Sequence, residues 1–214
     1  MVYGKIRDKK IVSIIRGSSY EACPAIVNAL YEGGIELCEV TFNAKDDQPT
    51  PDTLASISYI ASTFSGKMLA GAGTVMNIRQ VEAAAEAGAE FILSPDCNPA
   101  VIQRTKELGL VSIPGALTPT EVATAFQYGA DMVKLFPAGN LGIDYIKAIR
   151  APISHIPLMA VGGVELNNAR QFLNAGCVAL GIGSSLVSGA RIAQKRFDEI
   201  AELARQFVEA VSEN

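Results

Sequence analysis

The chain has 214 residues, 49% of them hydrophobic and 19% charged, which supports one globular core and excludes a disordered chain. Its net charge of −4, with no basic run longer than Lys9-Lys10, argues against nucleic acid or an acidic membrane as a partner. The sequence has no signal-peptide pattern, no apolar stretch of membrane-spanning length and no Cys-x-x-Cys pair. We therefore expect a cytoplasmic protein with neither a zinc site nor disulfides.

Short apolar runs typical of buried strands recur along the chain and alternate with segments of helical spacing. The runs lie at 11–16, 35–42, 68–72, 90–94, 110–113, 131–136, 157–161 and 178–182. Helical segments include 76–88, 118–129 and a final helix predicted over 190–211. The second of these begins with Thr118-Pro119-Thr120-Glu121, in which Thr118 is a good cap and Glu121 stands three residues after it.

Eight strand–helix units in this length predict a (β/α)₈ TIM barrel that forms a single domain over 1–214. An open doubly wound sheet is the alternative architecture. Arg16-Gly17-Ser18-Ser19, after the first run, does not supply the G-x-G-x-x-G turn typical of dinucleotide-binding sheets. We therefore favour the barrel, in which the carboxyl ends of the strands carry the chemistry.

Several strand ends carry residues suited to binding or catalysis. In chain order they are Arg16 after the first run, Glu39, Thr41 and Asn43 at the second, Thr74 after the third, Ser94-Pro95-Asp96 after the fourth, and Lys134 with Phe136 at the sixth. Alternate residues of a strand share one face, so Glu39 is expected among apolar neighbours. A carboxylate in such surroundings is unfavourable unless it has a charged partner or a function. A carboxylate, an amine and a guanidinium are thus expected to converge on one end of the barrel.

Lys134 lies in the apolar run Met132-Val133-Lys134-Leu135-Phe136-Pro137, so its ammonium group is expected to be buried whichever face it takes. Burial lowers the pKa of a lysine toward the neutral amine, which is the nucleophile that Schiff-base chemistry requires. The alternative is a structural lysine neutralised by a buried carboxylate. Because buried ion pairs seldom stabilise a fold more than apolar residues would, Lys134 taken with Glu39 and Arg16 indicates function.

These three residues have complementary roles in the chemistry of an α-keto acid such as pyruvate. Lys134 would attack the ketone and form an iminium, an electron sink that permits carbon–carbon cleavage. Glu39 would move protons, and Arg16 would hold the carboxylate in a bidentate fashion. The small polar side chains nearby suit an orienting role but are also common in caps and turns: Thr41, Asn43 and Thr74.

Glycine-rich turns follow the seventh and eighth runs. They are Val161-Gly162-Gly163-Val164 and Gly181-Ile182-Gly183-Ser184-Ser185. Glycines let backbone N–H groups approach an anion, and barrels often bind phosphate at these two positions. Each turn alone is weak evidence, but the two together predict that a phosphorylated keto acid spans the mouth of the barrel. Its carboxylate would lie at Arg16 and its phosphate near Gly163 and Ser184.

The single histidine, His155, precedes the seventh run and is therefore expected at the opposite face of the barrel. Metal-dependent aldolases need several histidine ligands, and the strand ends carry no cluster of Asp and Glu for a magnesium ion. We expect no metal and no cofactor other than a covalent Schiff base on Lys134.

The motifs also match a known family, in the same order along the chain. They are Glu39-Val40-Thr41-Phe42-Asn43, Gly71-Ala72-Gly73-Thr74-Val75, Ser94-Pro95, Val133-Lys134-Leu135-Phe136-Pro137-Ala138 and the two glycine-rich turns. Over essentially its whole length the chain resembles the 2-keto-3-deoxy-6-phosphogluconate aldolases and their 4-hydroxy-2-oxoglutarate and 6-phosphogalactonate relatives. The resemblance implies a class I aldolase, usually a homotrimer, that cleaves a 2-keto-3-deoxy-6-phospho-sugar acid to pyruvate and glyceraldehyde 3-phosphate.

The resemblance implies roles for individual residues as well. It assigns the Schiff-base lysine to Lys134 and the acid/base glutamate to Glu39. The positions implied to contact pyruvate are Thr74, Pro95 and Phe136. The positions implied to form the phosphate loops are Gly162, Gly163, Gly183, Ser184 and Ser185.

Two departures from the family pattern bear on the substrate. Many gluconate-type members carry an arginine where this chain has Asn43, and that arginine binds the pyruvate carboxylate. In this chain Arg16 would bind the carboxylate instead. Many also carry a threonine where this chain has Val161, which cannot donate a hydrogen bond to a sugar hydroxyl. Both features resemble the 6-phosphogalactonate type. Alternatives are a 4-hydroxy-2-oxoglutarate aldolase or oxaloacetate decarboxylase, and a non-catalytic phosphate-binding barrel.

Overall fold

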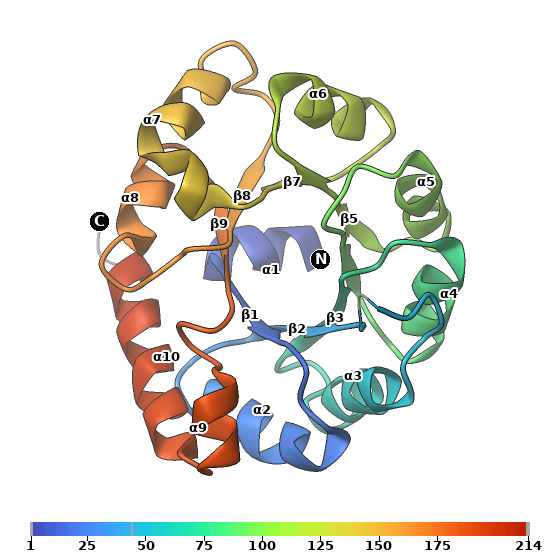
Figure 1. Cartoon of the computed structure of the whole chain (residues 1–214), viewed down its shortest axis with the longest axis vertical. Helices are drawn as coiled ribbons and strands as arrows, with labels where there is room; N and C mark the ends of the chain where they lie inside the picture. The colour runs from blue at the N-terminus through green and yellow to red at the C-terminus, as the bar shows by residue number, and fades with distance from the viewer. Residues whose placement is uncertain (1, 44, 213–214) are drawn as a thin grey trace.

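The computed structural model describes residues 2–43 and 45–212, whose strands form one parallel barrel surrounded by helices (Figure 1). The strands are β1 Ile11–Ile15, β2 Leu37–Thr41, β3 Leu69–Gly73, β4 Phe91–Leu93, β5 Val111–Ile113, β6 Gly115–Ala116, β7 Val133–Leu135, β8 Leu158–Val161 and β9 Ala179–Ile182. They are hydrogen-bonded in the order β5-β4-β3-β2-β1-β9-β8-β7-β6, and every pair is parallel.

β5 and β6 are two halves of one barrel strand, separated by Pro114 alone. β5 pairs with β4 on one side and β6 with β7 on the other, so the chain itself closes the ring. Proline has no N–H to donate, but its carbonyl still accepts a bond from the Lys134 backbone at 2.8 Å. The barrel therefore has eight strand positions, and the predicted (β/α)₈ TIM barrel is confirmed.

The helices cover the outside of the barrel, apart from the first. They are α1 Val2–Lys9, the 3₁₀ turn η1 Tyr20–Ala22, α2 Cys23–Glu32, α3 Pro51–Thr63, α4 Ile78–Glu86, α5 Pro99–Glu107, α6 Pro119–Gln127, α7 Ala138–Arg150, α8 Ala169–Asn174, α9 Gly189–Ala193 and α10 Phe197–Ser212. The start predicted for α6 is confirmed, because Thr118 and Glu121 form a reciprocal capping box.

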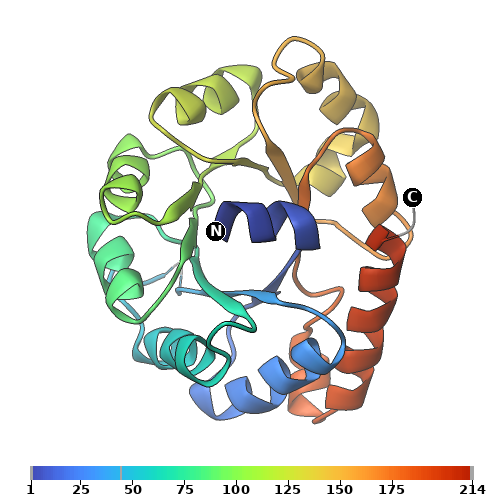
Figure 2. The same cartoon turned by 180° about the vertical axis from the view of Figure 1, so that it is seen from behind.

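α1 is a helix that the sequence did not predict, and it lies across the amino end of the barrel (Figure 2). Its Ile6 side chain is fully buried and packs with apolar residues of the barrel interior. The segment is polar overall and contains Gly4, so its own propensity for a helix is low. Tertiary packing, which sequence periodicity does not report, holds this helix in place.

The prediction of one continuous final helix over 190–211 is wrong. The chain forms α9 and α10 instead, with a break at Lys195, whose φ of 53° lies in the left-handed region. The broken turn is closed by a bond from the Arg196 N–H to the Arg191 carbonyl at 2.9 Å. The residues around the break are good helix formers, namely Gln194, Lys195 and Arg196, so no local sequence pattern predicts it.

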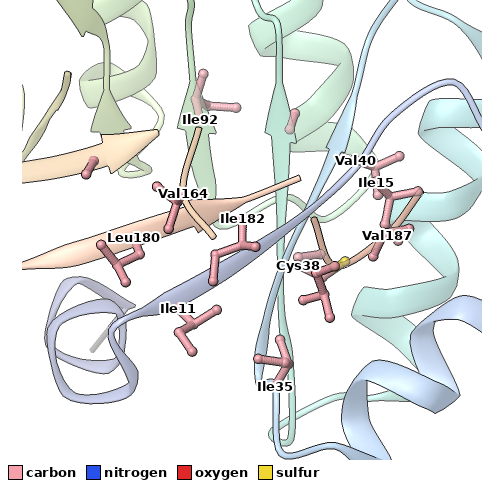
Figure 3. Packing of buried hydrophobic residues seen from close by; sticks show 14 of the residues in the cluster. Ile11, Ile15, Ile35, Cys38, Val40, Ile92, Val164, Leu180, Ile182 and Val187 are labelled. Atoms are coloured by element: carbon pink, nitrogen blue, oxygen red, sulfur yellow. The ribbon is translucent and has the colours of Figure 1, made fainter. Parts of the chain in front are cut away.

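Strand side chains alternate between an outer and an inner apolar layer. Outward side chains pack between the sheet and the helices, as Ile15 and Val40 of neighbouring strands do in Figure 3. Inward side chains fill the barrel core, and they include Val12, Leu37, Phe91, Ile113 and Met159. Within the part of the chain that the structure describes, this interior also holds the only buried carboxylate, Glu39, and the only buried ammonium group, Lys134.

Candidate active site

Glu39 and Lys134 face the barrel interior from nearly opposite sides of the ring. Glu39 is fully buried on β2 and lies opposite Gly71 of β3. Lys134 is 3% exposed on β7 and lies between Gly115 of β6 and Met159 of β8. The alternation predicted for these two strands is therefore confirmed.

The two charged groups and Arg16 influence one another electrostatically. Burial raises the pKa of the Glu39 carboxyl, and the positive charges of Lys134 and Arg16 oppose that rise. Burial lowers the pKa of the Lys134 ammonium group; the Glu39 carboxylate opposes this fall and Arg16 adds to it. The three residues predicted to converge are thus brought within electrostatic reach of one another.

Neither carboxylate oxygen of Glu39 has a hydrogen-bond partner within the described residues, although both are buried. Leaving a buried acceptor unpaired is costly, and such groups concentrate at functional sites. An unpaired carboxylate beside a buried amine of lowered pKa is equipped to exchange protons with a bound molecule. The purely structural interpretation of the pair would instead have required direct, well-satisfied hydrogen bonds.

Phe136 connects the buried amine with the mouth of the barrel. Its ring centroid is 4.9 Å from Nζ of Lys134, and the side chain is 40% exposed. An exposed aromatic ring above a reactive amine offers an apolar contact for a small organic substrate. The ring therefore marks where a bound molecule would pass from solvent to Lys134.

A cavity of about 200 Å³ opens at the carboxyl ends of β1, β8 and β9. The predicted site residues that line it are Arg16, Phe136, Val161, Gly162, Gly163, Gly183, Ser184 and Ser185. Four further lining residues were not among the predicted contact positions, namely Ile14, Val164, Glu165 and Gly181, although Val164 and Gly181 belong to the two predicted glycine-rich turns. Ile14 carries no polar side-chain group that could have marked it in the sequence.

The two glycine-rich turns present free backbone donors to this cavity. Gly162 and Gly163 have φ of 85° and 73°, in the left-handed region that favours glycine. The N–H groups of Gly163, Ser184 and Ser185 have no backbone acceptor within residues 2–43 and 45–212. The Ser185 hydroxyl donates to the Val164 carbonyl at 2.7 Å and so ties the two turns together. Ser185 can thus offer its N–H, but not its hydroxyl proton, to an anion.

The remaining predicted residues, Lys134 and Glu39 among them, lie outside the lining of this cavity. Thr41 is buried, with its hydroxyl oxygen unpaired in the described structure, and Thr74 is buried with a φ of 56°. The carbonyl of Pro95 packs against Gly115, the neighbour of Lys134. Asn43 is exposed, and its side-chain oxygen accepts a bond from the Lys45 N–H at 3.1 Å. The structure does not bring Asn43 to the cavity, and its place in the site stays a prediction.

A second hollow of about 640 Å³ lies at the amino end of the barrel, beside α1. Three cationic residues line it, and two of them, Lys10 and Arg170, donate to the Val211 carbonyl near the end of α10, so these two serve the helix terminus. His155 is exposed and packs edge-on against Phe126, far from Lys134 in the fold. Among the described residues, no group of three or more His, Cys, Asp or Glu side chains is arranged to hold a metal ion.

The model of the KDPG and KHG aldolase family matches residues 2–203. The chain belongs to the KDPG and KHG aldolase family. Among its relatives, the 2-dehydro-3-deoxy-6-phosphogalactonate aldolase of Escherichia coli strain K12 is 34% identical, covering 94% of this chain and 96% of the relative. The KHG/KDPG aldolase of the same strain is 32% identical, covering 93% of this chain and 91% of the relative.

Solved structures agree with this family membership. A native KDPGal structure is 35% identical with a TM-score of 0.85, covering 94% of this chain and 93% of that one. The KDPG aldolase of Legionella pneumophila, 26% identical with a TM-score of 0.85, covers 95% of this chain and 96% of that one. That enzyme was captured with pyruvate as a covalent carbinolamine. This KDPG/KHG aldolase family member is therefore a lyase of the Schiff-base class. This finding contradicts the alternative of a non-catalytic phosphate-binding barrel.

No helix within residues 2–43 and 45–212 of this aldolase is long and apolar enough to cross a membrane.

Proposed function

We propose that this aldolase cleaves a 2-keto-3-deoxy-6-phospho-sugar acid to pyruvate and glyceraldehyde 3-phosphate, with Lys134 as its nucleophile and no metal or separate cofactor. The observation that carries the proposal is the position of Lys134. It is an almost fully buried amine with a lowered pKa, and it lies within electrostatic reach of a buried carboxylate at the catalytic end of a barrel.

The reaction would begin with attack of the neutral Lys134 amine on the ketone carbon, followed by loss of water to give an iminium. Glu39, as the carboxylate, would then take the proton from the hydroxyl on the carbon two positions from the iminium carbon. The bond between the third and fourth substrate carbons breaks as that hydroxyl becomes an aldehyde, and its electrons pass into the iminium to form an enamine. Return of the proton to the enamine carbon and hydrolysis would release pyruvate and restore Lys134.

The lining of the cavity suits the two charged ends of this substrate. Arg16 would hold the carboxylate, since a guanidinium matches its two oxygens. The free N–H groups of Gly163, Ser184 and Ser185 would bind the phosphate, as backbone donors do at this position in other barrels. Phe136, Thr41 and Thr74 would contact or orient the pyruvate portion. A phosphorylated keto acid would thus span the site from Arg16 to Ser184.

The galactonate-type epimer is the substrate that we favour. Val161 lines the cavity at the position where a threonine hydroxyl would contact the sugar chain. Two relatives that are 34% and 36% identical are named 2-dehydro-3-deoxy-6-phosphogalactonate aldolases, the second as probable. Val161→Thr should therefore improve cleavage of the gluconate epimer relative to the galactonate epimer by about 10-fold, the scale of one hydrogen bond to a substrate hydroxyl.

The proposal is tested by measuring pyruvate release from both phosphorylated epimers and from 4-hydroxy-2-oxoglutarate. We expect the highest kcat/KM for the galactonate epimer, no turnover by Lys134→Ala, and binding without rapid cleavage by Glu39→Gln. Unaltered turnover by Lys134→Ala would contradict the mechanism. Faster cleavage of 4-hydroxy-2-oxoglutarate would contradict the substrate while leaving the mechanism intact.

We also propose that the enzyme is a cytoplasmic homotrimer. A neighbour 35% identical with a TM-score of 0.84, covering 94% of this chain and 71% of that one, is a cage designed by fusing symmetric oligomeric domains. This chain exposes apolar side chains around α4 and α6, as an oligomer interface would require. They are Met76, Ile78, Leu117, Phe126 and Tyr128.

A further inference from the structure

The Glu39 side chain fills the space beside Gly73 on the neighbouring strand. β2 and β3 pair so that Glu39 lies opposite Gly71, and Gly73 is the next residue on the same face of β3. A β-carbon built at Gly73 would lie 2.7 Å from Cγ of Glu39, and closer still to Cδ and Oε1. Any side chain at position 73 would therefore displace the carboxylate.

Packing, rather than hydrogen bonding, determines the position of the Glu39 carboxylate. Both of its oxygens are buried, and neither has a hydrogen-bond partner within the described residues. The attraction of Lys134 and Arg16 favours side-chain directions that bring the charge nearer to them, but a direction can be taken only where there is space for the carboxylate. The gap at Gly73 is the feature that allows the observed side-chain direction.

The two glycines of β3 differ in what an added methyl group would meet. At Gly71 it would overlap the ring of Phe91, which is fully buried in the packed core and has no room to move. At Gly73 the three nearest atoms all belong to the flexible Glu39 side chain, and the φ of Gly73 is not in the left-handed region. Alanine at position 73 is therefore compatible with the fold but incompatible with the observed position of the Glu39 carboxylate.

We propose that Gly73 is a positioning residue for proton transfer: its missing side chain lets the Glu39 carboxylate stand in the barrel interior within reach of the adduct on Lys134. This inference rests on the proposed role of Glu39. Gly73→Ala should separate two events that share one site, formation of the pyruvate imine on Lys134 and movement of protons by Glu39.

Both events can be measured on the same protein with pyruvate alone. Borohydride reduction and intact mass report the extent of imine formation at saturating pyruvate. Proton NMR in heavy water reports exchange of the pyruvate methyl protons, which requires the enamine and a proton carrier. For Gly73→Ala we expect near wild-type trapping and melting temperature, and exchange slowed by about 100-fold, the scale of general acid–base catalysis. Gly4→Ala, a change in open space on α1, is the matched control and should leave both readouts unchanged.

A double-mutant cycle tests whether Gly73 acts through Glu39. Glu39→Ala should lose exchange, and adding Gly73→Ala should then cost nothing further, because no carboxylate is left to displace. Wild-type exchange in Gly73→Ala would overturn the inference. So would a further loss in the double variant, or a joint fall of trapping, exchange and melting temperature. If Glu39→Ala itself exchanged at the wild-type rate, the proposed role of Glu39 would fail as well, and the two failures are thus distinguishable.

Discussion

Lys134 and Glu39 are held in a place where their charges are poorly solvated, so the site should cost the protein stability. Replacing both with methionine, which has a similar shape, should raise the free energy of unfolding at pH 7 by about 1–4 kcal/mol and abolish turnover. Urea unfolding of the wild type and Lys134→Met/Glu39→Met checks this. A less stable double variant would show that the pair stabilises the fold, as a structural ion pair would.

The pH dependence of that difference follows from the signs of the two pKa shifts. The raised pKa of Glu39 destabilises the fold increasingly as the pH rises above the ordinary value of 4.5. The lowered pKa of Lys134 destabilises it at low pH, and this cost disappears as the pH approaches the ordinary value of 10.5. The advantage of the double variant should therefore be largest between these limits and should shrink at both ends.

Arg16 should act on both the binding of the keto acid and the protonation of Lys134. Its positive charge lowers the pKa of Lys134, so Arg16→Gln should move the acid limb of pyruvate trapping to higher pH. Loss of the charged hydrogen bonds to the carboxylate should raise KM by about 10- to 100-fold. Arg7→Gln, an exposed charge change on α1, is the control. An unchanged acid limb in Arg16→Gln would contradict the electrostatic coupling.

The apolar runs around Lys134 and Glu39 were enough to predict that both side chains are buried, because a charge within an apolar run stands out, but they left open which face Lys134 takes. The sequence could not reveal Ile14 in the cavity, since such a residue resembles an ordinary core position. The contact of Glu39 with Gly73 depends on the register of two strands whose paired residues, such as Glu39 and Gly71, are 32 positions apart in the sequence, and no local pattern encodes that register. The roles of these residues in binding and catalysis stay predictions.

At the scale of elements, α1 should matter more for stability than its weak sequence signal suggests. Its Ile6 side chain is fully buried at the amino end of the barrel, so Ile6→Ala should lower the free energy of unfolding by about 2–5 kcal/mol. Asp8→Ala, an exposed change on the same helix, should have an effect within about 0.5 kcal/mol. Equal effects of the two variants in thermal or urea unfolding would contradict the expected contribution of the buried Ile6 side chain to stability.

The elements with strong local signals were predictable, and those that depend on tertiary contacts were not. Thr118 and Glu121 mark the start of α6 because both halves of a capping box lie within four residues. By contrast, α1 has few apolar residues, and the break at Lys195 occurs among good helix formers. Both follow from packing against parts of the chain that are distant in sequence.

For the molecule as a whole, the barrel was predictable because eight apolar runs alternate with helical segments. The trimer was implied by the family resemblance alone, because an interface has no periodicity in the sequence. Light scattering on the purified protein should give about three times the chain mass of 22.6 kDa if the proposed trimer forms. A mass equal to one chain at micromolar concentration would contradict the trimer without affecting the proposed chemistry.

In the proposed reaction, Lys134 forms a Schiff base with the keto acid. The most direct test of this step is borohydride reduction of the protein in the presence of pyruvate, followed by intact mass and peptide mapping, with Lys134→Ala treated in parallel. We expect one reduced pyruvyl group per chain, located on Lys134 and absent from the variant. No adduct in folded wild-type protein, or an adduct on another lysine, would contradict the proposal that Lys134 forms the Schiff base.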